Sequence, residues 1–330
     1  MKKYLFVFIS IMFFSPAFAD EASDWQNIYS QVQSSYINDI SVSQLAIASL
    51  KGIQSVDSNL RLADDNKRLS LYYRGKVIKV AAKPDDNDVA SWGKITADII
   101  SSAIQSSPRA DKNSFQITDA LAQAMLKVLD SDSEFYSGID EAGGSVKRNK
   151  RYCSDRLLDN SVLYIKIIAI NKQTKQDLIN SLERYPDASK LIIDLRGCLG
   201  GMAGEAIKIA DLFLNSGIIA STHGKNHLKQ TFYNADEDEL FADKPIEILT
   251  DEQTASAAEI MTAALQEQSR ATVLGKKTFG KGTTQKLIPL PSGGVLAITS
   301  GYFQTPSGRP LQKQGIIPDI DEENPYQTLL

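Results

Sequence analysis

The chain has 330 residues, of which 42% are hydrophobic and 23% charged, and its 36 basic residues are outnumbered by 40 acidic ones. This acidic balance argues against nucleic acid or an anionic membrane surface as a natural partner. The length is enough for one large domain or two moderate ones.

The first 19 residues have the pattern of a secretory signal peptide. Lys2 and Lys3 precede the apolar run YLFVFISIMFF, and Ala17 and Ala19 form a small-residue cleavage site. The run is shorter than the roughly 18 to 20 apolar residues of an uncleaved anchor. We expect cleavage before Asp20, a mature chain of 34 basic and 40 acidic residues, no stable membrane insertion, and a periplasmic location.

Residues 20–150 are predicted to be mainly helical. Apolar residues recur at helical spacing in DWQNIYSQVQSSYIND and VSQLAIASLKGIQSV, and again in VASWGKITADIISSAIQ and ITDALAQAMLKVL. A polar segment, SSPRADKNS, separates the last two. RLSLYYRGKVIKVAA contains two β-type runs around Arg74 and Gly75, which predicts a hairpin. No residue pattern in this region indicates chemistry.

Residues 151–330 alternate between strand and helix patterns. From Ser161, the segments SVLYIKIIAI, KQTKQDLINSLERY, KLIIDLRG, EAIKIADLFLNS and GIIASTHG predict a β-α-β-α-β succession. The strands are continuously apolar, which indicates burial on both faces. Farther on, KLIPLPSGGVLAITSGYFQTPSG predicts a hairpin closed by residues 292–294. Such strands beside a nucleophile commonly form a wall for an extended peptide.

Ser256 stands where a predicted strand gives way to a predicted helix. PIEILT precedes it, and AAEIMTAALQEQ after it is rich in helix formers. At such a junction the first helical N–H groups lack internal partners and the helix dipole favours negative charge. Ser256 is therefore a candidate nucleophile. The alternative is that Ser256 or Thr254 only caps the helix.

A serine nucleophile needs a base, and the usual base is histidine. His223 and His227 stand four residues apart in a polar, loop-like run, which leaves a metal pair as an alternative without an evident third ligand. A lysine can act as the base where its surroundings exclude water. Lys281, between two glycines in TFGKG, is the candidate, and Gln285 could orient it. An ordinary exposed loop lysine is the alternative.

A second glycine-containing loop follows KLIIDLRG. Gly200 and Gly201 allow a backbone amide to point into a site, where it would form an oxyanion hole with the Ala257 amide. A plain strand-to-helix turn is the alternative. The sequence indicates structural roles for Asp194 and Arg196, and a helix-start carboxylate at Glu259.

Cys153 and Cys198 are the only cysteines. An oxidising compartment permits a disulfide between them, and two buried thiols are the other interpretation. Cys198 lies in the glycine-containing loop that we expect to border the active site.

Three ordered blocks resemble the carboxy-terminal processing peptidases, or tail-specific proteases, a serine peptidase family with a Ser-Lys pair. They are DLRGCLGGMAGEAIKIADLFL, TASAAEIMTAALQEQSRATVLGKKTFGKGTTQ and GYFQTPSGRPLQKQGIIPDI. The resemblance implies that Ser256 is the nucleophile, Lys281 the general base and Gln285 the residue supporting the lysine. It also implies an α/β fold with a crotonase/Clp-peptidase-like core of β-β-α type units, here preceded by a mainly helical N-terminal region.

The chain departs from that family before the peptidase core. Typical members carry a PDZ domain there, which binds the carboxy-terminus of the substrate as an added strand. Only 24 residues separate Tyr136 from Ser161, whereas domains seldom fall below about 50 residues. We therefore predict that the PDZ domain is missing, which leaves the selection of carboxy-terminal tails open.

These patterns together predict a secreted serine endopeptidase that acts on a protein or peptide through an acyl-enzyme, without a metal or other cofactor. A homo-oligomer or an adaptor protein is a further possible partner. One alternative is an inactive or partner-activated family member that binds peptide. The other is a crotonase-like acyl-thioester enzyme, against which the signal peptide argues because coenzyme A chemistry is cytoplasmic.

Overall fold

The computed structural model describes residues 21–137, 152–158, 161–225, 230–236, 239–323 and 326. Within these ranges the chain forms two compact units. The N-terminal unit comprises the residues up to 137 together with 285–300, and the C-terminal unit comprises the residues from 152 to 284 and from 301 onward. The predicted signal peptide lies outside the described residues. Of the helices that the structure describes, none is long and apolar enough to cross a membrane.

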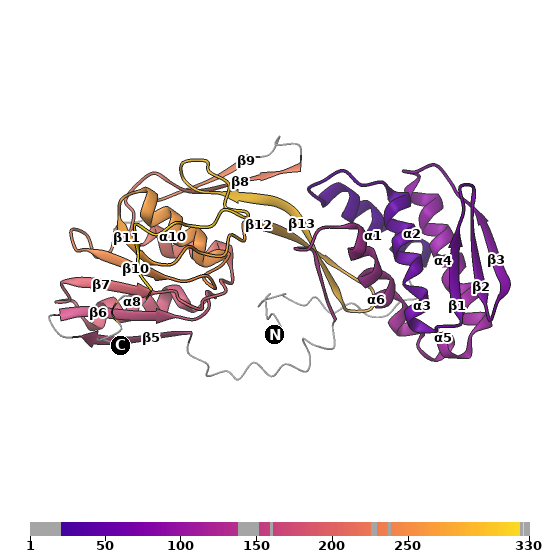
Figure 1. The fold of residues 1–330 in the computed structure, drawn as a ribbon, viewed down its shortest axis with the longest axis horizontal. Helices are drawn as coiled ribbons and strands as arrows, with labels where there is room; N and C mark the ends of the chain where they lie inside the picture. Colours follow the sequence, from indigo (N-terminus) through magenta and orange to yellow (C-terminus); the bar gives the residue numbers. More distant parts are fainter. Residues whose placement is uncertain are drawn as a thin grey trace. The chain divides into compact units, whose positions relative to one another are not determined.

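The N-terminal unit is built mainly of helices (Figure 1). Helix α1 packs against α4, and α2 packs against α6. Their buried side chains, with Trp92 and Tyr29 among the largest, form one hydrophobic core. The helices predicted from apolar spacing are thus confirmed. The helices that the structure describes in this unit are α1 (Glu21–Ser35), α2 (Val42–Lys51), α3 (Ile53–Val56), α4 (Val89–Ser106), α5 (Pro108–Lys112), α6 (Ser114–Met125) and the 3-10 turn η1 (Leu126–Val128).

Helix α5 lies in the polar segment for which the sequence predicts no helix. The Ser107 hydroxyl accepts a hydrogen bond from the Ala110 amide at 3.1 Å, and Pro108 occupies the first turn. A serine cap followed by proline is a helix-start signal that apolar periodicity does not detect.

A three-stranded antiparallel sheet completes this unit, in the order β1 (Leu60–Asp64), β2 (Arg68–Tyr73) and β3 (Lys76–Ala82). The β2–β3 pair is the predicted hairpin around Arg74 and Gly75, and β1 is an additional strand. Leu69 and Leu71 of β2 are buried in the core of the unit.

The predicted hairpin near residue 293 is formed by β12 (Thr283–Pro289) and β13 (Val295–Gln304). The Leu290 amide closes it by donating to the Gly294 carbonyl at 2.8 Å. Residues 285–300 belong to the N-terminal unit, where β4 (Glu134–Tyr136) pairs with β13. The sequence places this hairpin with the residues after 150. The structure places it otherwise because four of its side chains are buried in the N-terminal core, namely Ile288, Leu290, Leu296 and Ile298.

The C-terminal unit contains a six-stranded sheet in the order β14-β11-β10-β7-β6-β5. Its strands are β5 (Cys153–Leu158), β6 (Val162–Ile167), β7 (Lys190–Asp194), β10 (Ile246–Thr250), β11 (Ala271–Gly275) and β14 (Ile320–Asp321). All neighbouring strands are parallel except β5, which runs antiparallel to β6.

The predicted β-α-β-α-β succession is confirmed in its first four elements, β6, α8 (Thr174–Arg184), β7 and α9 (Ala203–Asp211). The fifth, β8 (Ile218–Gly224), does not join that sheet. It pairs antiparallel with β9 (Gln230–Asn234) and with β13 in a second sheet. Apolar patterning shows that a strand is buried but does not identify the strand it pairs with.

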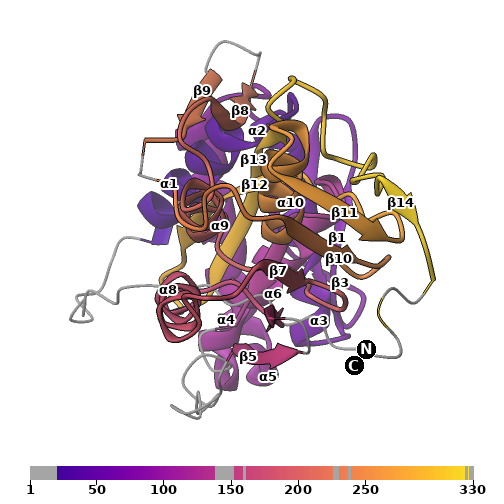
Figure 2. The same cartoon turned by 90° about the vertical axis from the view of Figure 1, so that its left-hand side faces the viewer.

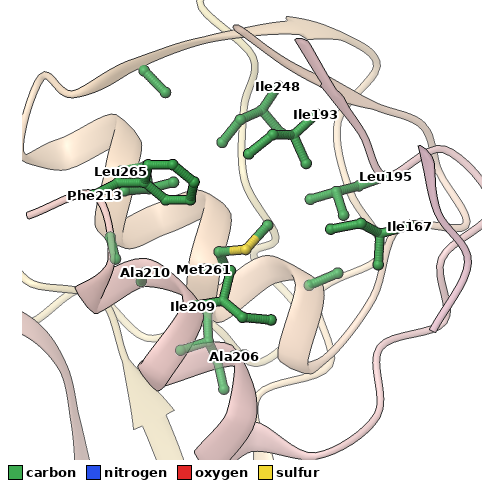
Figure 3. Packing of buried hydrophobic residues seen from close by; sticks show 14 of the residues in the cluster. Ile167, Ile193, Leu195, Ala206, Ile209, Ala210, Phe213, Ile248, Met261 and Leu265 are labelled. Carbon is green, nitrogen blue, oxygen red and sulfur yellow. The ribbon is translucent and has the colours of Figure 1, made fainter. Parts of the chain in front are cut away.

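Both faces of the six-stranded sheet are covered at its centre, as the apolar strands predict. On one face the sheet packs against α8, α9 and α10 (Ala257–Glu267), with α9 and α10 in contact with each other (Figure 2). Figure 3 shows this core, where Ile193 and Ile248 of the sheet lie near Phe213 and Leu265. The opposite face carries a smaller cluster of Tyr164, Ile192, Leu249 and Leu274. The molecule is thus a mixed α/β protein with N-terminal helices.

Candidate active site

Ser256 occupies the sharp turn between β10 and α10. Its φ is 58° and its ψ is −121°, a backbone conformation that residues other than glycine rarely adopt. A strained serine between a strand and a helix has the geometry of a nucleophile elbow, which presents the hydroxyl at the helix N-terminus. Because α10 begins at Ala257, the Ala257 amide has no acceptor inside the helix.

One buried carboxylate connects the serine turn to the lysine loop. Glu259, at the third position of α10, is fully buried. Its Oε2 accepts hydrogen bonds from the Ser256 amide at 2.7 Å and from the Lys281 amide at 2.9 Å. Its Oε1 accepts from the Gly280 amide at 2.7 Å and from the Thr278 hydroxyl at 2.5 Å. The backbones of Ser256 and Lys281 are therefore held at the same side chain.

The four groups bonded to Glu259 are all donors, so both oxygens of its carboxylate act as acceptors. Burial raises the pKa of Glu259 above its ordinary value, while the bonds from Thr278 and from the three amides oppose that rise. The Thr278 oxygen already accepts the Ile316 amide at 2.7 Å, so its proton is directed to Glu259. The sequence predicts only a helix-start carboxylate here. The spacing Ser-x-x-Glu could have identified the bond to Ser256, but not the bonds to the lysine loop.

The lysine loop is tied to the serine turn by a second set of bonds. The Phe279 amide donates to the Thr254 carbonyl at 3.0 Å, and the Gly282 amide donates to Gln312 Oε1 at 2.7 Å. These contacts fix the backbone on both sides of Lys281.

Gln285 belongs to the N-terminal unit, unlike Lys281. Its Nε2 donates to the main-chain carbonyl of Asp132, a contact that the sequence does not indicate. Because Nε2 is engaged as a donor, the amide is oriented and Oε1 is the atom that can accept from an amine. The support that Gln285 is predicted to give Lys281 stays a prediction.

The glycine loop lies directly against the serine turn. A Cβ on Gly200 would lie 2.5 Å from the Ala255 carbonyl oxygen and 2.9 Å from both the Ala257 nitrogen and Ser256 Cβ. Any side chain at this position would therefore displace the candidate nucleophile. Gly201 has a φ of 146°, and a Cβ there would collide with the Ile170 carbonyl.

The backbone pattern distinguishes the two candidate oxyanion glycines. The parallel bridge between Ile170 and Gly201 uses the Gly200 carbonyl and the Met202 amide, each at 2.9 Å from its partner atom on Ile170. The Gly201 amide takes no part in this bridge. Burial raises the pKa of Cys198 to about 11, and a hydrogen bond from the Gly200 amide to the thiol opposes that rise. The Gly201 amide is therefore the candidate partner of Ala257, and this role stays a prediction.

Replacement of Gly201 by alanine is expected to lower kcat/KM for peptide hydrolysis about 10²- to 10³-fold, the usual loss for one oxyanion donor, because the new Cβ would displace the loop. Gly197→Ala is the matched control. Its φ is 72° and nothing lies within 4 Å of its Cβ, so it adds strain without a collision. Equal losses in the two variants would mean that general loop strain, and not the Gly201 position, controls activity.

Polar side chains hold the glycine loop and the serine turn together. The Asp251 carboxylate accepts from the Gly197 amide through both oxygens at 2.9 Å, and from the Thr254 amide at 2.9 Å. The Thr254 hydroxyl donates to the Leu195 carbonyl at 3.0 Å. Between the loops, the Ala255 amide donates to the Cys198 carbonyl at 3.0 Å. The two loops thus form one hydrogen-bonded structure.

Asp194 braces the start of the glycine loop at the end of β7. It is buried and accepts from Tyr164 Oη at 2.7 Å, Lys166 Nζ at 3.0 Å and Arg196 Nη2 at 2.6 Å. Burial alone would raise the pKa of Asp194, but the bonds from Arg196 and Tyr164 and the charge of Lys166 hold it below its ordinary value. These contacts fit the structural roles that the sequence indicates for Asp194 and Arg196.

The depressed pKa of Asp194 makes the stability of the C-terminal unit dependent on pH. Its contribution is present above the unfolded pKa of about 3.9 and is lost as pH falls through the lower folded pKa. We expect Asp194→Asn to lower the free energy of unfolding by about 3 kcal/mol or more at neutral pH. The difference between the two proteins in denaturant titrations should shrink below about pH 4. A difference that is constant with pH would contradict this assignment.

The sequence also leaves open a disulfide between the two cysteines and a metal pair of histidines. In the structure Cys153 and Cys198 are two buried free thiols, and they are not joined in a disulfide. His223 lies on β8 opposite Tyr302, and His227 lies outside the described residues. Among the residues that the structure covers, no group of three His, Cys, Asp or Glu side chains is placed to hold a metal ion. The paired-histidine metal site therefore stays untested.

The part of the chain that contains this site is similar in sequence to known proteins. Residues 161–322 match peptidase family S41. The carboxy-terminal-processing protease of Bartonella bacilliformis is 37% identical over 174 residues, covering 51% of this chain and 40% of that protein. The carboxyl-terminal-processing protease of a Synechocystis species is 35% identical over 167 residues, covering 50% and 39%. The chain thus spans about two fifths of the length of these relatives.

A solved structure described as a photosystem II D1 C-terminal processing protease has a similar fold. The TM-score is 0.55 at 15% sequence identity, and the similarity covers 92% of this chain and 94% of that one. The sequence similarity is thus concentrated in the part that carries Ser256 and Lys281, while the fold similarity extends over most of the chain. Over residues 161–322 the chain belongs to peptidase family S41, and this part of it is homologous to the carboxy-terminal processing proteases.

Proposed function

We propose that the chain is a secreted Ser-Lys endopeptidase that cleaves peptide bonds through an acyl-enzyme on Ser256. The observation that carries the proposal is the Glu259 carboxylate, which bonds to the amides of both Ser256 and Lys281 at a helix N-terminus. A nucleophile, a base and open backbone amides in one place are the requirements of acyl transfer.

In this mechanism the neutral amine of Lys281 takes the proton of the Ser256 hydroxyl as the oxygen attacks the substrate carbonyl. The amides of Gly201 and Ala257 stabilise the oxyanion of the tetrahedral intermediate. The lysine ammonium then protonates the leaving amine. Water, activated by the same lysine, releases the acyl group and restores the free serine. Gln285 Oε1 would accept a hydrogen bond from the amine and keep it directed at Ser256.

Substrate selection and location are further parts of the proposal. Sixteen residues separate β4 from β5, fewer than the roughly 50 of a small domain. This supports an enzyme that selects substrates through its own peptidase surface or through an adaptor protein, without a PDZ domain at that point of the chain. The pattern of residues 1–19 supports the periplasm. The alternation of strands and helices supports a core of the crotonase and Clp peptidase kind.

The proposal can be tested with residues 20–330, a serine-directed covalent probe and an unfolded reporter protein carrying matched carboxy-terminal tails. We expect labelling at Ser256, cleavage of the reporter and no inhibition by chelators. Heat-denatured protein controls for non-specific labelling. Reporter binding without labelling or cleavage would favour a peptide-binding or partner-activated protein, and inhibition by chelators would contradict the Ser-Lys mechanism. The tail dependence of cleavage shows whether carboxy-termini are selected.

A further inference from the structure

Two large apolar side chains in the C-terminal unit are exposed beside the serine turn. Leu199 is 53% exposed and Phe279 is 61% exposed. The neighbours Cys198, Gly200, Thr278 and Gly280 are all buried. An exposed leucine or phenylalanine alone is ordinary, but two of them on the loops of one candidate active site require an explanation.

The backbone contacts place the residues that carry these side chains on two loops beside Ser256. Leu199 precedes Gly200, on which a Cβ would lie 2.9 Å from Ser256 Cβ. Phe279 donates its amide to the Thr254 carbonyl at 3.0 Å, two residues before Ser256, and it lies two residues before Lys281. One apolar side chain therefore comes from the glycine loop and the other from the lysine loop.

Both loops hold these side chains on a fixed backbone. The Cys198 carbonyl, next to Leu199, accepts the Ala255 amide at 3.0 Å. The Gly280 amide, next to Phe279, donates to Glu259 at 2.7 Å. We expect a peptide whose carbonyl reaches Ser256 to run along these two loops. Its side chains would cover apolar surface that is already in place, and little ordering of the enzyme would be needed.

We propose that Leu199 and Phe279 are specificity-determining residues that bind apolar substrate side chains next to the scissile bond. This inference rests on the proposed peptidase function and adds the chemical class of the cleaved sequence. The proposed occupant is the substrate itself, because both residues lie on loops whose backbones are hydrogen-bonded to the serine turn.

The test compares the wild type with Leu199→Ser and Phe279→Ser on paired peptides. The members of each pair differ only in leucine or asparagine beside the scissile bond, which changes polarity at nearly constant size. We expect the wild type to cleave the apolar member at least about tenfold more efficiently, as contacts of this size allow. Each variant should lose about tenfold in kcat/KM on the apolar peptide, mainly through KM. Cleavage of the polar peptide should change little.

Matched controls come from exposed apolar residues of the N-terminal unit. Val80 is 51% exposed and Phe115 is 76% exposed, and Val80→Ser and Phe115→Ser should leave the preference intact. Labelling by a small serine-directed probe should persist in all four variants, because it does not need an extended substrate. Cleavage without a preference in the wild type, or with the preference retained in both loop variants, would overturn this inference alone. Absence of both labelling and cleavage in the wild type would overturn the proposed function, and this inference with it.

Discussion

Replacement of Lys281 by methionine is expected to lower kcat/KM for peptide hydrolysis at least about 10³-fold, and Ser256→Ala to lower it about 10⁴-fold or more. Methionine keeps the length and apolar stem of the lysine but cannot accept a proton. The Lys281 amide would keep its bond to Glu259, so the loop should stay in place. Initial rates on an unfolded reporter protein measure both losses.

The matched control for Lys281 is Lys277→Met in the same loop. Lys277 is exposed and has no place in the proposed mechanism, so its replacement should leave the rate within about twofold, in keeping with the small effects of surface substitutions. If Lys281→Met retained wild-type rates, another group would have to be the base.

Replacement of Glu259 by alanine is expected to lower both stability and activity. It leaves the Thr278 hydroxyl and three amides, those of Ser256, Gly280 and Lys281, without their acceptor in a buried place. The expected loss in the free energy of unfolding is about 3 to 5 kcal/mol. Because the serine turn and the lysine loop would then lose the side chain that bonds to both, we expect kcat/KM to fall about 10²-fold or more even where the variant is folded. Denaturant titration and labelling by a serine-directed probe measure the two effects independently.

Two further substitutions make this prediction specific to the Glu259 carboxylate. Glu267→Ala removes a glutamate from the same helix, whose carboxylate accepts the Ser307 amide at 2.8 Å and lies 3.4 Å from Arg309; it should cost about 1 kcal/mol or less. Glu259→Gln keeps the size but turns an NH₂ group toward donors, so it should recover only part of the activity. Wild-type labelling of folded Glu259→Ala would show that the carboxylate is not needed to position the two residues.

The local part of the site could be predicted from the sequence. A buried strand, a small-residue turn and a run of helix formers indicate the Ser256 elbow without knowledge of any distant contact. The glycines around Lys281 and the family resemblance indicate that it is the base. The hydrogen bonds that Glu259 accepts from Thr278, Gly280 and Lys281 join segments that are remote in the sequence. Such contacts leave no periodic pattern in the sequence from which they could be predicted. The choice between Gly200 and Gly201 likewise depends on Ile170, a residue outside the loop.

The fold could be predicted element by element, but its pairings could not. The helices and the β2–β3 hairpin follow from apolar spacing and turn residues. Strand β8 pairs with β9 and β13, and the residues of β8 do not indicate which strands these partners are. Ser107 and Pro108 indicate the start of α5, but a capping signal of this kind does not depend on apolar spacing.

The hairpin of β12 and β13 limits which segments of this protein can be expressed as separate, folded proteins. Family similarity spans residues 161–322, which invites expression of that segment as a minimal enzyme. Ile288, Leu290, Leu296 and Ile298 of the hairpin are buried among side chains of residues 25–125. A truncated protein would present these four apolar residues to water in two adjacent strands, a known route to aggregation. The boundaries of homology are therefore not boundaries of independent folding.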